Sequence, residues 1–200
     1  FSAAPGLVPA LVARGFAVEP YRYLARDLDD KVRPTARFAW HPGDAAQLPD
    51  LLAGSYGPAS STRPFARGDR PEEWRHYAAQ LLGSMACGRF VAPLSAADIG
   101  PDGRLGAAIV TTAVAPDTVH IAQVAVAPWR RGTGLATAML DDVLARARMA
   151  GYARATLLVS DRNPGAIRIY RRAGFSETAT FVSAGRGAYP RRSTSPALET

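Results

Sequence analysis

Residues 123–140 read QVAVAPWRRGTGLATAML, and this stretch decides the fold. The apolar residues before Pro128 are typical of a strand, and those from Leu135 onward recur at the spacing of an amphipathic helix. Between them lies a glycine turn, which we define as residues 131–136. Its glycines let the backbone pass close to a ligand, and the unpaired N–H groups at a helix start favour a pyrophosphate. A tight corner without a ligand would contain the same turn, so this motif leaves both interpretations open.

Two common nucleotide-binding motifs do not match the glycine turn. A Walker loop is excluded because no Gly-Lys-Ser/Thr sequence follows the glycines. The dinucleotide-binding fingerprint needs a third Gly or Ala where Thr137 stands. In addition, tight turns join the strand-like runs 89–94, 104–114 and 118–128, so the strand before the glycine turn belongs to an antiparallel meander.

The remaining patterns place the glycine turn within a mixed sheet. The predicted order is strand, helix, helix, three strands, helix, strand, helix and strand. These elements occupy residues 36–40, 41–57, 71–82, 89–94, 104–114, 118–128, 135–151, 155–160, 164–173 and 178–184. This order predicts an α+β (mixed α/β) domain over residues 36–184, with a central, mostly antiparallel mixed sheet and helices on both faces.

A second motif begins after the strand that follows the long helix. Ala166, Tyr170, Gly174 and Phe175 stand at positions +3, +7, +11 and +12 from Asn163. Helical spacing brings Asn163, Ala166 and Tyr170 close together on adjacent turns. An Asn can both donate to and accept from an amide-bearing ligand, and a Tyr hydroxyl can donate a proton. Taken by itself, Tyr170 is more typical of an ordinary core tyrosine.

With both motifs present, the sequence resembles the GNAT superfamily of acetyl-CoA-dependent N-acetyltransferases. The matching residues are R-x-x-G-x-A at 131–136 and N-x-x-A-x-x-x-Y-x-x-x-G-F at 163–175, and the resemblance covers residues 36–184. It implies direct transfer of an acetyl group from acetyl-CoA to a primary amine. The acceptor would be a small molecule or the N-terminus of a peptide or protein.

The resemblance also implies a role for each motif. The turn at 131–137 would hold the pyrophosphate of coenzyme A through main-chain N–H groups. The strand at 121–126 would diverge from its neighbour after a bulge and pair with the pantetheine arm. Asn163 would bind the same arm, and Tyr170 would protonate the departing thiolate. The implied cofactor-binding residues are Val124, Ala125, Val126, Arg131, Gly132, Thr133, Gly134, Leu135, Ala136, Thr137, Asn163 and Tyr170.

The motifs do not assign a general base. Many family members place a Glu on the strand before the glycine turn or on the strand before the Asn, but residues 120–123 and 157–159 contain no carboxylate. His120 is the candidate base, because its ordinary pKa lies near neutral pH. Asp161 and a chain of water molecules are alternatives.

The missing carboxylate supports two hypotheses about activity. In the first, the acceptor has a low pKa, as an α-amino group does at about 7.7–8.0, and needs less help than a lysine at about 10.4. In the second, the domain binds coenzyme A but no longer catalyses transfer.

The charge balance is typical of a protein with an anionic partner, and equally of a chain whose composition simply prefers arginine. The chain has 24 Lys and Arg against 17 Asp and Glu, a net charge of +7 and a pI near 10.2. We expect Arg130, Arg131, Arg168, Arg171 and Arg172 to place part of this charge near the phosphates of acetyl-CoA. The other arginines are scattered, no nucleic-acid reading motif is present and aromatic residues are 8%, which argues against a nucleic-acid partner.

The remaining residue types exclude several classes of protein. The single cysteine, Cys87, excludes an internal disulfide framework and a multi-cysteine zinc site. His41 and His76 do not have the spacing of metal ligands, so we expect no metal. No apolar run reaches the roughly 18 residues of a membrane span, and no signal peptide is visible, so we expect a cytoplasmic protein.

Residues 1–30 are expected to form an appendage of a helix and a strand, joined to the domain by a polar linker at 29–35. The sequence ARGF at 13–16 resembles RAGF at 172–175, which also precedes a strand. The appendage is therefore either the remnant of a duplicated acetyltransferase half or a strand that extends this sheet or that of a homodimer partner. Residues 185–200 have no core-forming pattern and are expected to form a loose tail.

Overall fold

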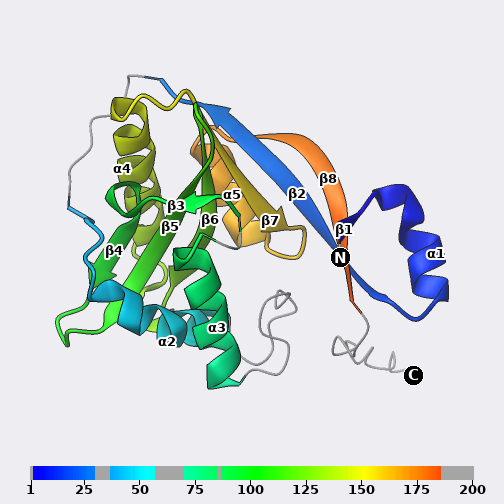
Figure 1. Cartoon of the computed structure of the whole chain (residues 1–200), viewed down its shortest axis with the longest axis horizontal. Coiled ribbons are helices and arrows are strands. Elements are labelled where there is room, and N and C mark those ends of the chain that lie inside the picture. The colour runs from blue at the N-terminus through cyan, green and yellow to red at the C-terminus, as the bar shows by residue number, and fades with distance from the viewer. Residues whose placement is uncertain (1, 30–36, 57–69, 85–86, 186–200) are drawn as a thin grey trace, which may run out of the picture.

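The computed structural model describes residues 2–29, 37–56, 70–84 and 87–185, in which helices cover both faces of a mixed sheet (Figure 1). The strands are β1 (Ser2–Ala3), β2 (Ala17–Asp27), β3 (Arg89–Phe90), β4 (Ala96–Ile99), β5 (Leu105–Ala115), β6 (Thr118–Val126), β7 (Arg154–Ser160) and β8 (Ser176–Gly185). The helices are α1 (Val8–Ala13), α2 (Asp44–Tyr56), α3 (Pro71–Leu82), α4 (Leu135–Met149) and α5 (Pro164–Arg172), with 3-10 turns at Pro5–Leu7, Ala92–Leu94 and Pro128–Arg130. The α+β fold class is confirmed, and the predicted tail beyond Gly185 lies outside the described residues.

The sheet has the strand order β1-β8-β2-β7-β6-β5-β3, and β4 also pairs with β5. β6 and β7 run parallel, whereas the other neighbouring strands run antiparallel. One face packs against α4 and α5, where Met139 and Leu157 are buried. The other face packs against α2 and α3, where Leu52, Trp74 and Val110 are buried. Each face thus has its own apolar layer, as an open sheet between helices requires.

Several short elements differ from the sequence prediction. The strand expected at 36–40 is reduced to a single bridge between Ala39 and Ala96. The strand expected at 89–94 stops at Phe90, and a 3-10 turn with Pro93 follows, because proline has no N–H for a sheet ladder. α2 contains Pro49 and continues through it to Tyr56.

β2 lies inside the sheet, between β7 and β8 and antiparallel to both. Tyr21 pairs with Ser160 of β7 on one side and with Phe181 of β8 on the other. Leu24 is 1% exposed and belongs to the apolar layer under α4 and α5. The sequence analysis allowed this segment to extend the sheet, and β2 does so from an inner position rather than at an edge. Local sequence patterns do not reveal it, because the neighbours of a strand are chosen by contacts distant in sequence.

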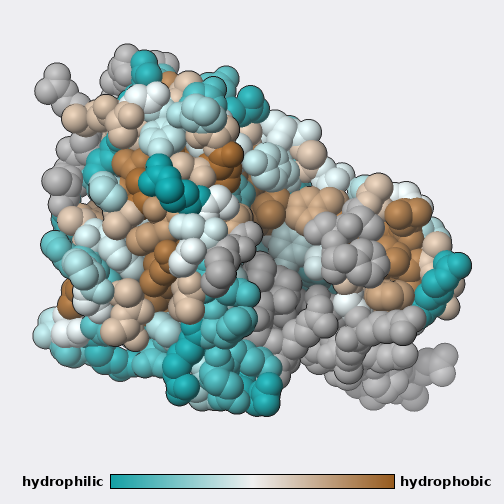
Figure 2. Space-filling model, viewed as in Figure 1, coloured by the Kyte–Doolittle hydropathy of each residue, from teal (hydrophilic) through white to brown (hydrophobic). Residues whose placement is uncertain are grey.

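The outer surface is uneven in polarity. Figure 2 shows apolar residues over α1, where Leu7 and Val12 are 53% and 57% exposed, and hydrophilic residues around the outer end of α3. α1 has no buried residue, so its packing against β2 adds little to the core. No helix within the described residues is long and apolar enough to cross a membrane.

Candidate active site

The parallel strands β6 and β7 separate halfway along their length. Their pairs run from Thr118–Arg154 to Ile121–Leu157 and then stop, although both strands continue. On its other side, β6 has a bulge at Ala122, because Val110 pairs with Gln123 and the next residue of β5 pairs with Ile121. A bulge bends its strand and increases the local twist. It therefore accounts for the gap between residues 122–126 and residues 158–160, which we call the β6–β7 opening.

The main chain of β6 faces this opening at two alternate residues. The Ala127 N–H donates to the Gly106 carbonyl at 2.8 Å, on the side of β5. Because backbone groups alternate in direction along a strand, those of Val124 and Val126 point toward the opening. The carbonyl of Val126 accepts from Arg131 Nε at 3.3 Å. Val124 and Val126 are thus oriented to pair with an extended ligand arm, as the resemblance implies.

The glycine turn joins β6 to α4 and leaves the start of that helix uncapped. Gly132 and Gly134 both have φ of +77°, a left-handed conformation that favours glycine. Gly134 is the N-cap of α4 and provides no side-chain cap. The Thr133 hydroxyl donates to the Arg130 carbonyl at 2.9 Å and holds the turn together. The first N–H groups of α4, including those of Leu135 and Ala136, therefore lack partners within the helix and fit an anionic group such as a pyrophosphate.

The arginines beside the turn are directed elsewhere. Arg130 Nη2 lies 2.6 Å from Asp98 Oδ2, and the Arg130 guanidinium lies over the Trp129 ring. Arg131 Nη2 donates to the Ser55 carbonyl at 2.5 Å, which ties the turn to α2. Asp98 therefore offsets the charge that Arg130 was expected to add beside the turn.

Arg168, Arg171 and Arg172 lie on α5. They line a surface cavity together with Pro164 and Ile167 of the same helix. Arg22 and Asp161, which form an ion pair, complete the lining.

Asn163 and Tyr170 lie at the start and on the buried side of α5. Asn163 Oδ1 caps the helix by accepting from the Ala166 N–H at 3.0 Å, which leaves the side-chain NH₂ group oriented outward. Tyr170 is 8% exposed, and its ring packs edge-on against Phe175. Burial raises the pKa of Tyr170 well above its ordinary value of 10, and the nearby Tyr56 phenol adds to this effect. Tyr170 therefore keeps its proton at neutral pH.

Three polar side chains meet on the face of the sheet that packs against α2 and α3. The Tyr77 hydroxyl donates to Gln123 Oε1 at 2.9 Å, and Gln123 Nε2 donates to the Tyr56 hydroxyl. Burial raises the pKa of both tyrosines. The Tyr56 phenol also contributes to the raised pKa of Tyr170. The sequence analysis missed this network, although a Gln in an otherwise apolar strand signals a buried amide that needs partners.

His120 lies just before the bulge, where β6 and β7 are still paired. It is 6% exposed, its Nδ1 lies 2.9 Å from Thr156 Oγ1, and its ring stacks on Tyr23. Burial lowers its pKa from 6.5 to about 4. His120 is therefore neutral at pH 7 and a weak base. The other candidate, Asp161, is paired with Arg22 on the opposite face of the sheet.

The low pKa of His120 predicts a loss of stability in acid. Between its folded value of about 4 and its ordinary value of 6.5, the unfolded chain binds the proton more tightly, so stability falls as the pH is lowered through this range. From pH 7 to pH 4.5 the loss is about 2.5 kcal/mol. Urea denaturation of the wild type and of His120→Asn at both pH values measures it. Equal losses in the two proteins would contradict the assignment to His120.

Glu19 is a buried carboxylate that the sequence analysis missed. It is 1% exposed, on β2, and Oε1 accepts from the Ser160 hydroxyl at the end of β7. Oε2 lies 3.0 Å from Arg162 Nε. The signal was a Glu within a run of apolar and aromatic residues, but it fell in the segment expected to be an appendage.

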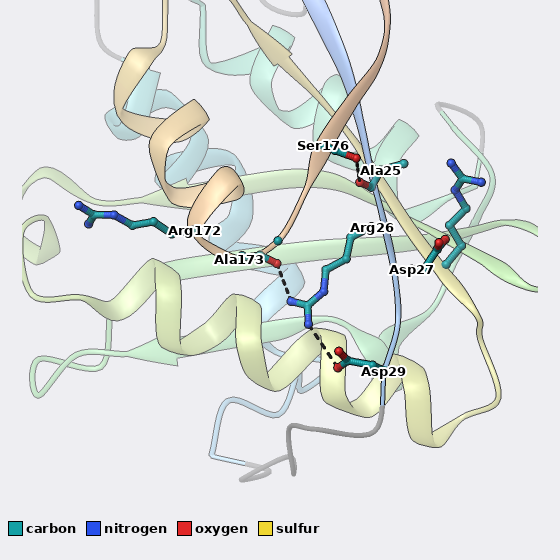
Figure 3. A pocket seen from close by; sticks show the side chains of 9 residues that line it. Ala25, Arg26, Asp27, Asp29, Arg172, Ala173 and Ser176 are labelled. Carbon is teal, nitrogen blue, oxygen red and sulfur yellow. Dashed lines mark hydrogen bonds and ion pairs between the residues drawn. The ribbon is translucent and has the colours of Figure 1, made fainter.

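A polar pocket at the other end of β7 is unrelated to this site. Figure 3 shows Arg26 donating to the Ala173 carbonyl at 2.5 Å and pairing with Asp29 at 3.6 Å. Arg154, the first residue of β7, also lines this pocket, whereas the opening lies beyond Leu157. We assign no role to the pocket. Within the described ranges, no group of three or more His, Cys, Asp or Glu residues could hold a metal ion.

Comparisons with known proteins agree with the fold and the motifs. Residues 52–175 match the model of the Acetyltransferase (GNAT) family. Among solved structures, the chain is similar to a GCN5-related N-acetyltransferase from Sphaerobacter thermophilus (20% identity, TM-score 0.60, covering 90% of this chain and 55% of that one). It is also similar to a putative GNAT-family acetyltransferase from Novosphingobium aromaticivorans (20% identity, TM-score 0.59, covering 85% of this chain and 66% of that one). A third similar structure is a putative GNAT-family acetyltransferase from Desulfovibrio desulfuricans (20% identity, TM-score 0.52, covering 84% of this chain and 98% of that one).

The chain thus spans 55% and 66% of the length of the first two structures. The comparison with curated proteins gives no match. At 20% identity, the solved structures establish the fold, which is the mixed α/β fold of the matched family. Because the family model matches more than half of the sequence, the chain belongs to the acetyltransferase (GNAT) family.

Proposed function

We propose that this protein transfers an acetyl group from acetyl-CoA to a primary amine. The acceptor is a small molecule or the N-terminus of a peptide or protein. Three features support the proposal: the uncapped start of α4, the β6 main chain that faces the opening, and the buried Tyr170 hydroxyl. The separation of β6 from β7 is the observation that carries it, because it leaves a strand edge free for an extended cofactor arm.

The binding steps follow from this path. The N–H groups of residues 132–136 receive the pyrophosphate, and the main chain of Val124 and Val126 pairs with the pantetheine arm. The Asn163 NH₂ group, which the helix cap leaves available, donates to the same arm. These contacts direct the acetyl group toward the face that carries α2 and α3, where the acceptor amine enters.

The reaction is a direct attack by the neutral amine on the thioester carbonyl. A C–N bond forms, the C–S bond breaks, and Tyr170 donates its proton to the leaving sulfur. The ammonium proton of the adduct returns to Tyr170 through solvent, so the protein ends unchanged. A β6 N–H at the opening polarises the carbonyl, and the rigid strands orient the two reactants.

A screen of thiol release tests the proposal. Purified protein with acetyl-CoA is mixed with alkylamines, aminoglycosides, polyamines and short peptides, and free coenzyme A is measured with a thiol reagent. We expect release that depends on one class of amine and on the protein. Tight binding of acetyl-CoA without release for any acceptor would favour the second candidate, a domain that binds coenzyme A without catalysis. The absence of a carboxylate on β6 and at residues 155–160 of β7 is the observation that favours it.

The absence of a carboxylate on these strands also predicts which acceptor amines react faster. An α-amino group with a pKa of about 7.7–8.0 is neutral in a far larger fraction at pH 7 than a lysine amine at about 10.4. We expect a peptide with a free α-amine and no lysine to react at least about 10-fold faster at pH 7 than its N-acetylated, lysine-containing counterpart. A strong preference for the ε-amine would overturn this expectation.

A further inference from the structure

Glu19 is a buried carboxylate with specific polar partners rather than a charge on the surface. A carboxylate with 1% exposure is costly unless its oxygens are partnered. Oε1 accepts from the Ser160 hydroxyl, and Ser160 Oγ in turn accepts from the Arg162 N–H at 3.1 Å. Oε2 lies near Arg162 Nε but accepts no hydrogen bond of good geometry. The carboxylate therefore has one oxygen that the described residues leave without a hydrogen-bond donor.

The strand register places this carboxylate on the face of the sheet that carries α2 and α3, where the proposed acceptor amine enters. Leu24 and Leu157 pair and face α4 and α5, so the alternate pair of Tyr21 and Ser160 faces α2 and α3. Glu19 bonds to Ser160 and shares this face. Ser160 ends β7 and belongs to the β6–β7 opening. Glu19 thus reaches the mouth of the opening from β2, a strand that the family motifs do not include.

Aromatic residues of β2 lie on the same face of the sheet as this carboxylate. Tyr21 stacks on Phe181 with ring centroids 5.5 Å apart, and Tyr23 stacks on His120 at 6.0 Å. Burial is the main cause of the raised pKa of Tyr77 on α3, and the Tyr21 phenol adds a smaller effect. Aromatic faces attract cations, so an ammonium group is favoured here before it loses its proton.

We propose that Glu19 receives, through the Ser160 hydroxyl, the proton that the acceptor ammonium must lose before attack. This inference rests on the proposed function. The ammonium gives its proton to Ser160 Oγ while the Ser160 hydroxyl gives its own to Glu19 Oε1. The products are a neutral amine, an unchanged serine and a protonated Glu19. Glu19 then releases the proton to solvent beside Arg162, whose side chain is 49% exposed.

Within the described residues, three polar groups stand close to Glu19. Arg162 faces it from the loop after β7, Tyr21 lies two residues along β2, and Ser183 of β8 stands opposite. The ion pairs of Arg22 with Asp161 and Glu177 are on the other face of the sheet. A change in pH dependence in a Glu19 variant can therefore be assigned to this relay.

The test compares kcat/KM from pH 6 to pH 10 for the wild type, Glu19→Gln and Ser160→Ala, with the fastest alkylamine from the thiol-release screen. We expect both variants to be about 100-fold slower at pH 7. The deficit should shrink to less than about 3-fold at pH 10, where the amine is neutral without help. Methoxyamine, which is neutral at pH 7, should react equally with all three proteins. Glu177→Gln is the control, because it removes a carboxylate from the other face.

Several outcomes would overturn the inference. A deficit that is the same at every pH, or the same for methoxyamine, would assign Glu19 a structural role. Wild-type rates in both variants would exclude the relay while the proposed function stands. No release by the wild type with any amine would remove the proposed function and this inference with it. If Glu19→Gln does not fold, Ser160→Ala carries the test, because it leaves the pair of Glu19 and Arg162 in place.

Discussion

Deletion of residues 1–28 is expected to abolish the folded state. β2 pairs with β7 over residues 21–27 and with β8 over 17–25, so its loss leaves two strands without their shared neighbour. Leu24 is 1% exposed, and the loss of one such leucine costs about 2–5 kcal/mol. Together with the pairing on both sides, this loss matches or exceeds the whole stability of a typical domain, about 5–15 kcal/mol. Circular dichroism during urea or thermal denaturation should show no cooperative transition.

A shorter deletion is the matched control. Removing residues 1–15 takes away β1 and α1, which has no buried residue, but keeps β2 intact. This variant should unfold cooperatively and lose less than about 2 kcal/mol, a value typical of single modest changes. If the longer deletion kept a cooperative transition at the wild-type temperature, β2 would not be an integral strand of the sheet.

Replacement of Tyr170 by Phe is expected to lower kcat by about 1,000-fold. The change removes one hydroxyl from a ring that is 8% exposed and leaves the contact with Phe175 in place. In the proposed reaction, this hydroxyl is the proton donor for the leaving thiolate. The Kd of acetyl-CoA should stay within about twofold, because the proposed pyrophosphate and pantetheine contacts come from the glycine turn, β6 and Asn163. Steady-state thiol release and calorimetric titration with acetyl-CoA measure the two quantities.

The alkaline limb of the pH profile adds a second check. Burial holds the pKa of Tyr170 above its ordinary value, so the wild type should keep this donor protonated up to at least pH 10. Tyr152→Phe is the control, because Tyr152 packs against the core just before β7, outside the opening. Full turnover in Tyr170→Phe at every pH would show that another group or water protonates the sulfur.

The sequence predicted the parts of the fold that depend on local patterns. The meander strand expected at 118–128 is β6 at Thr118–Val126, and the glycine turn and the start of α5 lie where their motifs indicate. The position of β2 could not be predicted in this way. Its neighbours come from the last third of the chain, and a helix, a Gly-Phe pair and a strand look alike in an appendage and inside a domain.

The candidate site also contains some contacts that follow from local sequence patterns and others that do not. Tyr170 and Asn163 belong to one continuous motif, so their proximity follows from helical spacing. Gln123 meets Tyr77 and Tyr56, which are 46 and 67 positions away, and no spacing rule connects them. Arg130 was expected to add charge to the turn, but its partner Asp98 lies 32 positions away in sequence and on another strand. Contacts of this kind depend on the completed tertiary structure.

The place of β2 in the sheet also has a consequence for biosynthesis. Glu19 and its partner Ser160 are 141 positions apart, so β2 leaves the ribosome long before either of its neighbours exists. At about 5–20 residues per second, the wait is on the order of ten seconds. During that time β2 has two unpaired edges and several exposed aromatic rings. A nascent chain of this protein therefore needs protection from aggregation until β7 and β8 have been made.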